Sequence, residues 1–269
     1  MRFVSRMIAV WLLAMAAVQA AECPRIVSQS PYLTMAIEWL GQGECIVGVS
    51  RYDTFKPALP RTGGVMDPDA KAIAALKPEL VVGSDMASEA AFAAAVPKGA
   101  TGVRLGGFGT MFEVEDMLET LARVIQSPEG GKVSGFRRGW FTRAKNSGAR
   151  GERVLLLTAC SGTPYSYGRK HVLGDLFHAA GFNVVDADVR VRAVRAGEAV
   201  ADLPALIAMT QPDIVFTFNR AAETECKVVL EAKGFKLIAL DGDNFLNPGH
   251  RMIDGLDEVT RIMRAQRTQ

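Results

Sequence analysis

The sequence lacks several features that mark common classes of protein. Its 31 basic and 29 acidic side chains nearly balance, and it has no basic cluster of the kind that binds nucleic acid. Beyond the N-terminal residues, no apolar run approaches the length that crosses a bilayer. The chain has four cysteines but no C-x-x-C pair, which argues against a zinc ribbon or a dithiol redox site. We therefore expect no nucleic-acid partner and no transmembrane helix in the body of the chain.

Catalytic motifs are also missing. Ser161, His171 and Asp175 are the residue types of an acyl-transfer triad, but no G-x-S-x-G elbow surrounds the serine. The glycines of residues 106–109 do not form a dinucleotide fingerprint, and no acidic partner follows them at the usual distance. We predict that the protein is not an enzyme and carries no cofactor of its own, although its ligand could contain iron or cobalt.

The N-terminus has the pattern of an export signal. Arg2 and Arg6 precede an apolar run from Met7 to Val18, and Val18-Gln19-Ala20 has the small residues of a cleavage site. We therefore expect residues 1–20 to be a cleaved signal peptide. Their removal takes away two of the 31 basic side chains and leaves a mature chain whose charge is close to zero.

Export places the cysteines in an oxidising compartment. Cys23 and Cys45 each precede a short apolar segment, residues 25–28 and 46–50. If these segments are neighbouring parallel strands, the two thiols start side by side, and we predict a disulfide between them. Such a bond closes a loop of roughly twenty residues and contributes about 3 kcal/mol in the chain-entropy model. The sequence leaves open whether Cys160 and Cys226 also pair.

Two segments of the chain repeat one pattern. Residues 63–85 begin with a glycine turn, enter a predicted helix at Asp67-Pro68-Asp69, and reach an apolar strand after Lys77-Pro78. The helix is expected to end there, because proline disfavours the helical conformation in the residue before it. Residues 205–216 repeat the helix, the proline, the acidic residue and the apolar strand. The two copies, about half a chain apart, predict two similar α/β lobes.

The remaining segments complete these lobes. Short apolar strands alternate with helices, as in a mainly parallel sheet that helices cover. The expected fold class is α/β, with two Rossmann-like lobes of parallel-rich sheets at residues 21–110 and 151–269. Linker helices occupy residues 111–150, with a break at Ser127-Pro128, and a single long linker helix is expected to join the lobes. A helical connector predicts lobe closure of small amplitude.

A set of motifs carries a resemblance to a known family. In chain order they are RIVSQSP, IVGVSRYD, LPRTGGVMDPDAKAIAALKPELVV, RVLLL, YSYG, LGDLFHAAGFNVV and DNFLNPGHRMIDGL. With the linker helix between them, the chain resembles periplasmic solute-binding proteins of the iron-siderophore and vitamin B12 uptake family over essentially all of its mature length. The resemblance implies a helical-backbone (class III) monomer in the periplasm. It would capture a bulky metal chelate or corrinoid between its lobes and deliver it to an inner-membrane ABC permease.

The resemblance places the ligand in the crevice between the lobes, where open α/β sheets bind ligands outside their strand carboxyl ends. The candidate residues lie in loops that follow the strands, and none is predicted to be a metal site. In the first lobe they are Gln29, Tyr32, Arg51, Tyr52, Val65, Met66, Ser84 and Asp85. In the second lobe they are Tyr165, Tyr167, Arg190, Arg192, Asn219, Arg220, Asp243 and Phe245.

The resemblance also bears on the type of ligand. Tyr52 falls where the vitamin B12-binding protein of the family carries a ligand-stacking tyrosine. Val65 and Ser84, however, occupy places where pocket tryptophans would be expected. The arginine-rich rim suits an anionic ligand, such as a ferric siderophore with carboxylates, through paired guanidinium contacts. For each arginine, a solvated surface position is the alternative interpretation.

The expected docking residues are missing as well. Family members commonly present one glutamate per lobe to arginines of the permease. Those places hold Lys71 and the Pro204-Ala205 region here, with Glu198 or Asp202 as nearby substitutes. A non-transport accessory or sensor protein on the same fold is therefore an alternative function.

Two further ligand classes can be weighed from single residue types. Haem is an alternative, because a tyrosine can ligate its iron, and the candidates are Tyr32, Tyr52, Tyr165 and Tyr167. A receptor for a bare zinc or manganese ion needs about four ligands drawn from both lobes. The histidines all fall in the second half of the chain, at His171, His178 and His250, which disfavours that reading. His171 and His178 are expected on a helix surface or at a helix cap.

Overall fold

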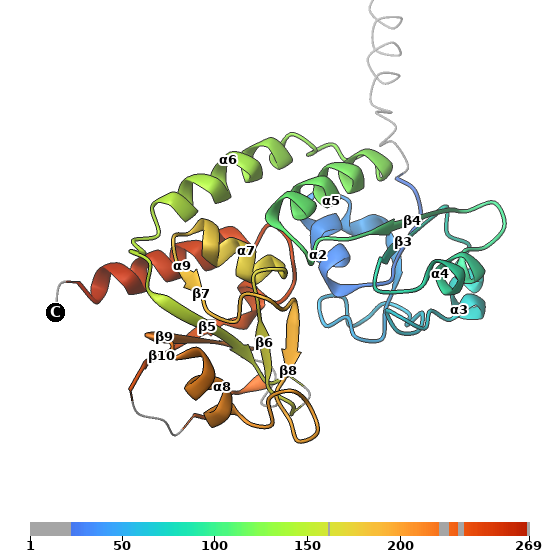
Figure 1. Ribbon diagram of the computed structural model, residues 1–269. Coiled ribbons are helices and arrows are strands. Elements are labelled where there is room, and N and C mark those ends of the chain that lie inside the picture. The colour runs from blue at the N-terminus through green and yellow to red at the C-terminus, as the bar shows by residue number, and fades with distance from the viewer. Residues whose placement is uncertain (1–22, 161, 221–225, 231–233, 268–269) are drawn as a thin grey trace, which may run out of the picture.

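The computed structural model describes residues 23–160, 162–220, 226–230 and 234–267 and shows two α/β lobes joined by helices (Figure 1). The predicted signal peptide lies outside the described residues. Within the described part of the chain, no helix is long and apolar enough to cross a membrane.

Lobe one contains a four-stranded sheet in the order β2-β1-β3-β4, and all its strand pairs are parallel. Its strands are β1 (Ile26–Ser28), β2 (Ile46–Val49), β3 (Leu80–Ser84) and β4 (Thr101–Leu105). The helices of this lobe are α2 (Pro31–Trp39), α3 (Ala70–Ala75) and α4 (Glu89–Ala95). Because all four strands run the same way, their carboxyl ends meet at one edge of the sheet.

The repeated unit folds as the sequence predicts. The Asp69 carboxylate caps α3 by accepting hydrogen bonds from the backbone N–H groups of Lys71 and Ala72. Lys77 has a left-handed backbone (φ 48°) and follows the end of the helix, and β3 is wholly buried. In lobe two, Asp202 caps α8 (Leu203–Thr210), and Gln211 ends it with the same left-handed conformation (φ 44°). Both copies of the helix-strand unit are therefore confirmed.

The predicted disulfide is also confirmed. β1 and β2 are parallel neighbours with Ile26 opposite Ile46, and Cys23 is bonded to Cys45. The pairing of the strands is what brings the two thiols together, as the spacing suggested.

The connector consists of two helices, α5 (Met111–Val124) and α6 (Lys132–Lys145). The predicted break is present, but α6 begins four residues beyond Pro128, at Lys132. The Ser127 hydroxyl fixes the intervening turn by donating to the carbonyl of Leu40 (2.6 Å) and accepting from the N–H of Glu129 (3.0 Å). In Figure 1, α5 lies against lobe one and α6 crosses toward lobe two, so α6 is the helix that joins the lobes.

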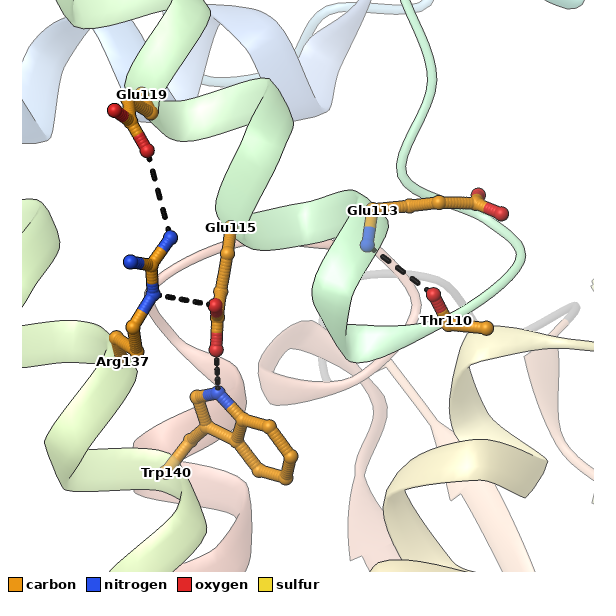
Figure 2. A network of polar contacts seen from close by, with 6 residues as sticks. All are labelled: Thr110, Glu113, Glu115, Glu119, Arg137 and Trp140. Atoms are coloured by element: carbon orange, nitrogen blue, oxygen red, sulfur yellow. Dashed lines mark hydrogen bonds and ion pairs between the residues drawn. The ribbon is translucent and has the colours of Figure 1, made fainter.

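A buried carboxylate joins the two connector helices (Figure 2). Glu115 of α5 is only 2% exposed. One of its oxygens accepts a hydrogen bond from Trp140 Nε1 and the other from Arg137 Nε, each at 2.6 Å. Arg137 also reaches Glu119 at 3.4 Å. Both donors lie on α6, so the Glu115 carboxylate fixes how α5 and α6 pack.

Lobe two contains a sheet in the order β10-β9-β5-β6-β8, with β7 paired to β5. The strands are β5 (Arg153–Thr158), β6 (Tyr165–Tyr167), β7 (Asn183–Val184), β8 (Val191–Ala193), β9 (Ile214–Asn219) and β10 (Lys236–Asp241). Its helices are α7 (Val172–Ala179), α8 and α9 (Met252–Ala265). The β10, β9, β5 and β7 pairings are parallel.

Two segments predicted as loops are strands. β6 pairs antiparallel with both β5 and β8, with Tyr165 opposite Ala193. In β6 the buried Ser166 separates two partly exposed tyrosines, which is the alternation of a strand with one buried face. The glycines and proline around this segment had favoured a turn. The sheet of lobe two is therefore mixed.

One continuous buried cluster extends through both lobes. It includes Leu33 of lobe one, Leu118 and Phe136 of the connector, and Leu176 and Met263 of lobe two. At its edge, the rings of Trp39 and His250 stack with centroids 5.0 Å apart, joining α2 to the segment before α9. The lobes thus share packing as well as a connector. This arrangement agrees with the expected small amplitude of lobe closure, which stays a prediction.

Candidate functional site

The carboxyl edge of the lobe-one sheet lies against lobe two. After β4, the carbonyl of Phe108 accepts a hydrogen bond from the N–H of Val172 at the start of α7 (2.9 Å). Nearby, Asp175 of α7 accepts from the N–H of Met111, the first residue of α5 (2.8 Å). Gly107 has a left-handed backbone (φ 124°) that lets the loop turn into this contact. The lobes therefore meet at the end of the strand where a ligand crevice was expected.

The Phe108 ring lies between the lobes. It packs edge-on against Tyr32 of lobe one (centroids 5.2 Å apart) and beside His171 of lobe two (6.1 Å). His171 in turn faces the ring of Tyr167 (4.5 Å). An aromatic row thus connects the lobes.

His171 caps α7, as the sequence predicted. Its Nδ1 accepts a hydrogen bond from the N–H of Leu173 (3.2 Å), so the neutral ring carries its proton on Nε2. Burial and the nearby charge of Arg190 lower the pKa of His171 to about 3. His178 lies exposed in the last turn of the same helix.

The structure describes two of the three residues considered from the sequence as an acyl-transfer triad. The side chains of His171 and Asp175 are engaged by the backbone of Leu173 and Met111, respectively. Ser161 lies outside the described residues.

A cavity of about 480 Å³ lies between the lobes beside this contact. Its wall is charged, and the charges come from both lobes and from α5. They are Asp85 and Arg104 of lobe one, Glu113 and Asp116 of α5, and Lys170 and Arg190 of lobe two. We call it the interlobe cavity. Asp85 and Arg190 were both predicted as site residues, and the structure brings them to the same cavity.

Arg104 is held in place by the backbone. Its Nη2 donates to the carbonyls of Asp85 (3.1 Å) and Ala87 (2.8 Å). Arg104, Lys170 and Glu113 were missed by sequence reasoning. A charged residue can alternate with apolar neighbours along an edge strand, or can follow a loop. In neither case does the local sequence indicate that the side chain faces another lobe.

Three apolar side chains stand exposed on the loops of lobe one. Tyr52 follows β2, Met66 lies in the loop before α3, and Met86 follows β3; they are 61%, 63% and 53% exposed. We call them the lobe-one lip. Two of them were predicted, and Met86 was missed because nothing in its local pattern distinguishes it from its neighbours. Arg51 stands over the Tyr52 ring (5.4 Å) and pairs with Asp67.

Four predicted residues are enclosed, which does not match a role in lining the crevice. Gln29 donates to the carbonyl (2.8 Å) and the hydroxyl (2.7 Å) of Thr62. The hydroxyl of Tyr32 donates to the carbonyl of Leu105 (2.6 Å), and burial raises its pKa. Ser84 is fully buried, and Phe245 packs in the core against Phe177 and Phe218. Their contacts stabilise the loops around the expected site from inside the protein.

The predicted polar residues of lobe two are largely paired with one another or with neighbours. Arg192 makes a two-pronged contact with the buried Asp186 (2.7 and 3.0 Å). Arg220 pairs with Asp243 at 3.7 Å, so two predicted residues meet. The Asn219 side chain accepts from the N–H of Val228 (3.4 Å) and stabilises its own loop.

The two predicted tyrosines of lobe two both lie on β6. Tyr165 and Tyr167 are both partly exposed. Desolvation raises the pKa of Tyr167 to about 12, so its hydroxyl stays protonated. Next to this strand, Cys160 is bonded to Cys226, which answers the pairing that the sequence left open. This bond ties the segment after β5 to the segment beyond Arg220.

The remaining predicted positions lie on the surface. Lys71 of α3 and Ala205 of α8 are exposed, at corresponding helices of the two repeats. The nearby acidic residues have other partners, since Glu198 pairs with Arg195 and Asp202 caps α8. No group of three or more metal-binding side chains occurs among the residues that the structure describes.

Comparison with protein families gives one match. A family model described as periplasmic binding protein matches residues 26–236, which is most of the chain. No curated protein sequence matches the chain.

Solved structures share the fold over nearly their whole length. The periplasmic heme-binding protein RhuT from Roseiflexus sp. RS-1 has a TM-score of 0.71 at 21% identity, covering 90% of this chain and 98% of that one. The vitamin B12-binding protein BtuF of Vibrio cholerae has a TM-score of 0.70 at 21% identity, covering 92% and 99%. The siderophore-binding protein BauB, bound to acinetobactin and ferric iron, has a TM-score of 0.68 at 17% identity, covering 90% and 93%. At these identities, the likeness establishes a common fold.

Proposed function

Because the chain belongs to the periplasmic binding protein family, we propose that it is the solute-binding component of an ABC importer. It captures a bulky metal chelate or corrinoid between its lobes and delivers it to a permease in the inner membrane. Residues 1–20 act as the export signal, and the mature protein works as a periplasmic monomer without catalysis. N-terminal sequencing of the exported protein tests the cleavage, with Ala21 as the expected first residue.

The observation that carries this proposal is the combination of the lobe-one lip and the interlobe cavity. Tyr52, Met66 and Met86 offer an apolar surface on the loops that follow β2 and β3, and Met86 directly follows Asp85 of the cavity wall. Charged groups of both lobes line the cavity beside it. An apolar surface beside charged groups suits a large ligand with an apolar body and polar arms. The solved structures with this fold are described as binding haem, vitamin B12 and a ferric siderophore, which are ligands of that size and character.

The decisive experiment is purification from the periplasm, followed by visible absorbance, native mass and titration with cobalamin, haem and a ferric siderophore. Saturable binding of one of them supports the proposal and selects the ligand class. Tyr52→Ala and Met66→Ser should each weaken that binding. Val229→Ala is the matched control, because Val229 is also apolar and exposed (78%) but lies in lobe two away from the lip. If the protein binds none of the three ligands in the titration, the assignment of a metal chelate or corrinoid as ligand is refuted.

Haem is a distinct candidate ligand with a specific observation in its favour. Tyr52 presents an exposed phenol at the lip, with the Arg51 guanidinium above its ring. A tyrosine oxygen is one of the axial ligands that hold haem iron in proteins. Haem bound in this way should lose its tyrosinate absorption bands in Tyr52→Phe, which keeps the ring.

A non-transport accessory or sensor role is the second alternative. The exposed side chains at Lys71 and Ala205 lack the carboxylates that would pair with permease arginines. Uptake of the bound ligand by cells that carry or lack the gene for this chain would separate transport from sensing.

A further inference from the structure

The charges of the interlobe cavity are divided between its walls. Lobe two contributes only cations, Lys170 and Arg190, whereas lobe one and α5 contribute the three carboxylates of Asp85, Glu113 and Asp116. The one cation on the lobe-one side, Arg104, is bound to backbone carbonyls. Opposite charges therefore face each other across the gap between the lobes.

These charges are not paired across the gap in this structure. Within the described residues, no ion pair joins Lys170 or Arg190 to Asp85, Glu113 or Asp116. Arg190 lies close enough to the buried neutral ring of His171 to disfavour its protonation. Among the residues that the structure describes, neither Lys170 nor Arg190 forms an ion pair with a carboxylate of lobe two.

Two of the carboxylates lie against residues 106–109, which we call the glycine loop. A Cβ atom at Gly106 would lie 2.9 Å from an Asp85 oxygen, so the absence of a side chain leaves room for that carboxylate. Glu113 accepts a hydrogen bond from the N–H of Gly109 (2.9 Å), which places its carboxylate over the same loop. Both groups are therefore held on the loop that ends at the contact with lobe two.

The contact between the lobes lies beside the charged walls. Phe108 belongs to the glycine loop, and its carbonyl bonds to Val172, two residues from Lys170. A rotation of lobe two about this contact moves the nearby charges by a short distance only. Ion pairs can therefore form there during a closure of small amplitude, which is the amplitude that the shared core allows.

From this geometry we infer that the closed state is held by an electrostatic latch, in which Lys170 and Arg190 of lobe two pair with Asp85 and Glu113 across the interlobe cavity. The inference rests on the proposed function, because a closed state retains the ligand. It gives these four side chains a role in closing the empty protein, besides the polar contacts with a ligand that the proposed function assigns to the cavity wall. Pairs of this kind at a partly hydrated site are screened by salt.

The latch can be tested without any ligand. Spin labels are attached through non-canonical residues at the exposed positions Lys98 and Lys236, one in each lobe, so that both disulfides remain intact. Distance distributions are then measured at about 0.01 M and about 1 M salt, where the Debye length is about 30 Å and about 3 Å. The population of molecules at the shorter distance, divided by the population at the longer distance, should fall roughly two- to fivefold at high salt. This is the range expected for exposed ion pairs.

Variants assign the effect to the named residues. The double change Lys170→Glu with Arg190→Glu should lower the population of the shorter distance and abolish its dependence on salt. Adding Asp85→Lys to this double variant should partly restore the population of the shorter distance and its dependence on salt. The milder pair Lys170→Gln with Arg190→Gln should act in the same direction. Lys71→Glu is the control, because it reverses an exposed charge on α3 outside the cavity and should change nothing.

Two results would overturn the latch. One is a distance distribution that is identical at both salt concentrations. The other is Asp85→Asn that leaves the shorter distance unchanged or more populated, which would mark the cations as a subsite for an anionic ligand. Because these measurements use the empty protein, failure to bind cobalamin, haem or a siderophore would refute the proposed function and leave the latch result standing.

Discussion

The Glu115 carboxylate should be the most sensitive polar group in the connector. It is 2% exposed and accepts one hydrogen bond on each oxygen, from Trp140 and Arg137 (2.6 Å each). In Glu115→Gln, the amide nitrogen replaces one of these acceptors and faces an N–H donor. The change removes the negative charge opposite Arg137 and leaves one buried donor without a partner. Losing one charge-assisted hydrogen bond and desolvating a donor together lower the unfolding free energy by about 2–4 kcal/mol.

The neighbouring residues provide a graded comparison. Trp140→Phe removes one donor and should cost about 1–3 kcal/mol, because it leaves a buried carboxylate oxygen unpaired. Arg137 is 53% exposed, so water can replace part of its contact with Glu115, and Arg137→Gln should cost no more than Trp140→Phe. Glu119→Gln should cost almost nothing, since Glu119 is 65% exposed and reaches Arg137 only at 3.4 Å.

Urea unfolding with both disulfides intact, followed by circular dichroism, measures the series. A loss of about 3 kcal/mol should also lower the melting temperature by roughly 6–12 °C for a chain of this size. The reasoning fails if Glu115→Gln unfolds within about 0.5 kcal/mol of the wild type, or if Glu119→Gln destabilises the protein more than Glu115→Gln.

Three other predictions concern binding, the disulfide and pH. Tyr52→Ala should weaken ligand binding more than His171→Ala in a titration, because Tyr52 is exposed at the lip and His171 caps a helix; equal affinities would count against the lip. Replacing Cys23 and Cys45 together by serine should lower the unfolding free energy by about 3 kcal/mol, and a loss under 1 kcal/mol in the same urea assay would contradict the expected loop constraint. Burial lowers the folded-state pKa of His171 to about 3, below its ordinary value of 6.5, so this residue stabilises the fold above pH 6.5. That stability should be lost as the pH falls from 6.5 toward 3, with a slope of up to about 1.4 kcal/mol per pH unit, and His171→Asn should flatten the part of the profile between pH 6.5 and 5.

Local signals in the sequence predicted much of the fold. The unit around Pro78 contains its own N-cap, its own helix end and its own buried strand within about fifteen residues, so no distant partner had to be known. The same holds for its copy around Pro212. The disulfide between Cys23 and Cys45 followed from one assumption about strand pairing, which the register of β1 and β2 bears out.

The strands β6 and β8 could not be predicted in the same way. Each has three residues, and glycine and proline occur close to β6. Segments this short are stabilised by cross-strand pairing and not by their own propensity. Their partners come from elsewhere in the chain, so the local sequence resembled a turn.

The site was predicted at the level of loops and not of side chains. Strand order identified loops of the expected site: Asp85 and Arg190 line the interlobe cavity, and Tyr52 and Met66 are exposed on the loops of lobe one. It could not tell that Phe245 turns into the core, because that direction depends on the aromatic cluster around it. Whether the placed residues bind a ligand stays a prediction.

The buried cluster that runs through both lobes has a consequence for how the chain can be divided. Expressed without its partner, either lobe would leave part of this cluster in water, including apolar residues that pack on α5 and α6. Exposed surface of that kind promotes aggregation. We therefore expect the predicted lobes, residues 21–110 and 151–269, to fold together as one unit. A chimera made by exchanging one lobe with that of a relative would need its connector and α9 exchanged as well.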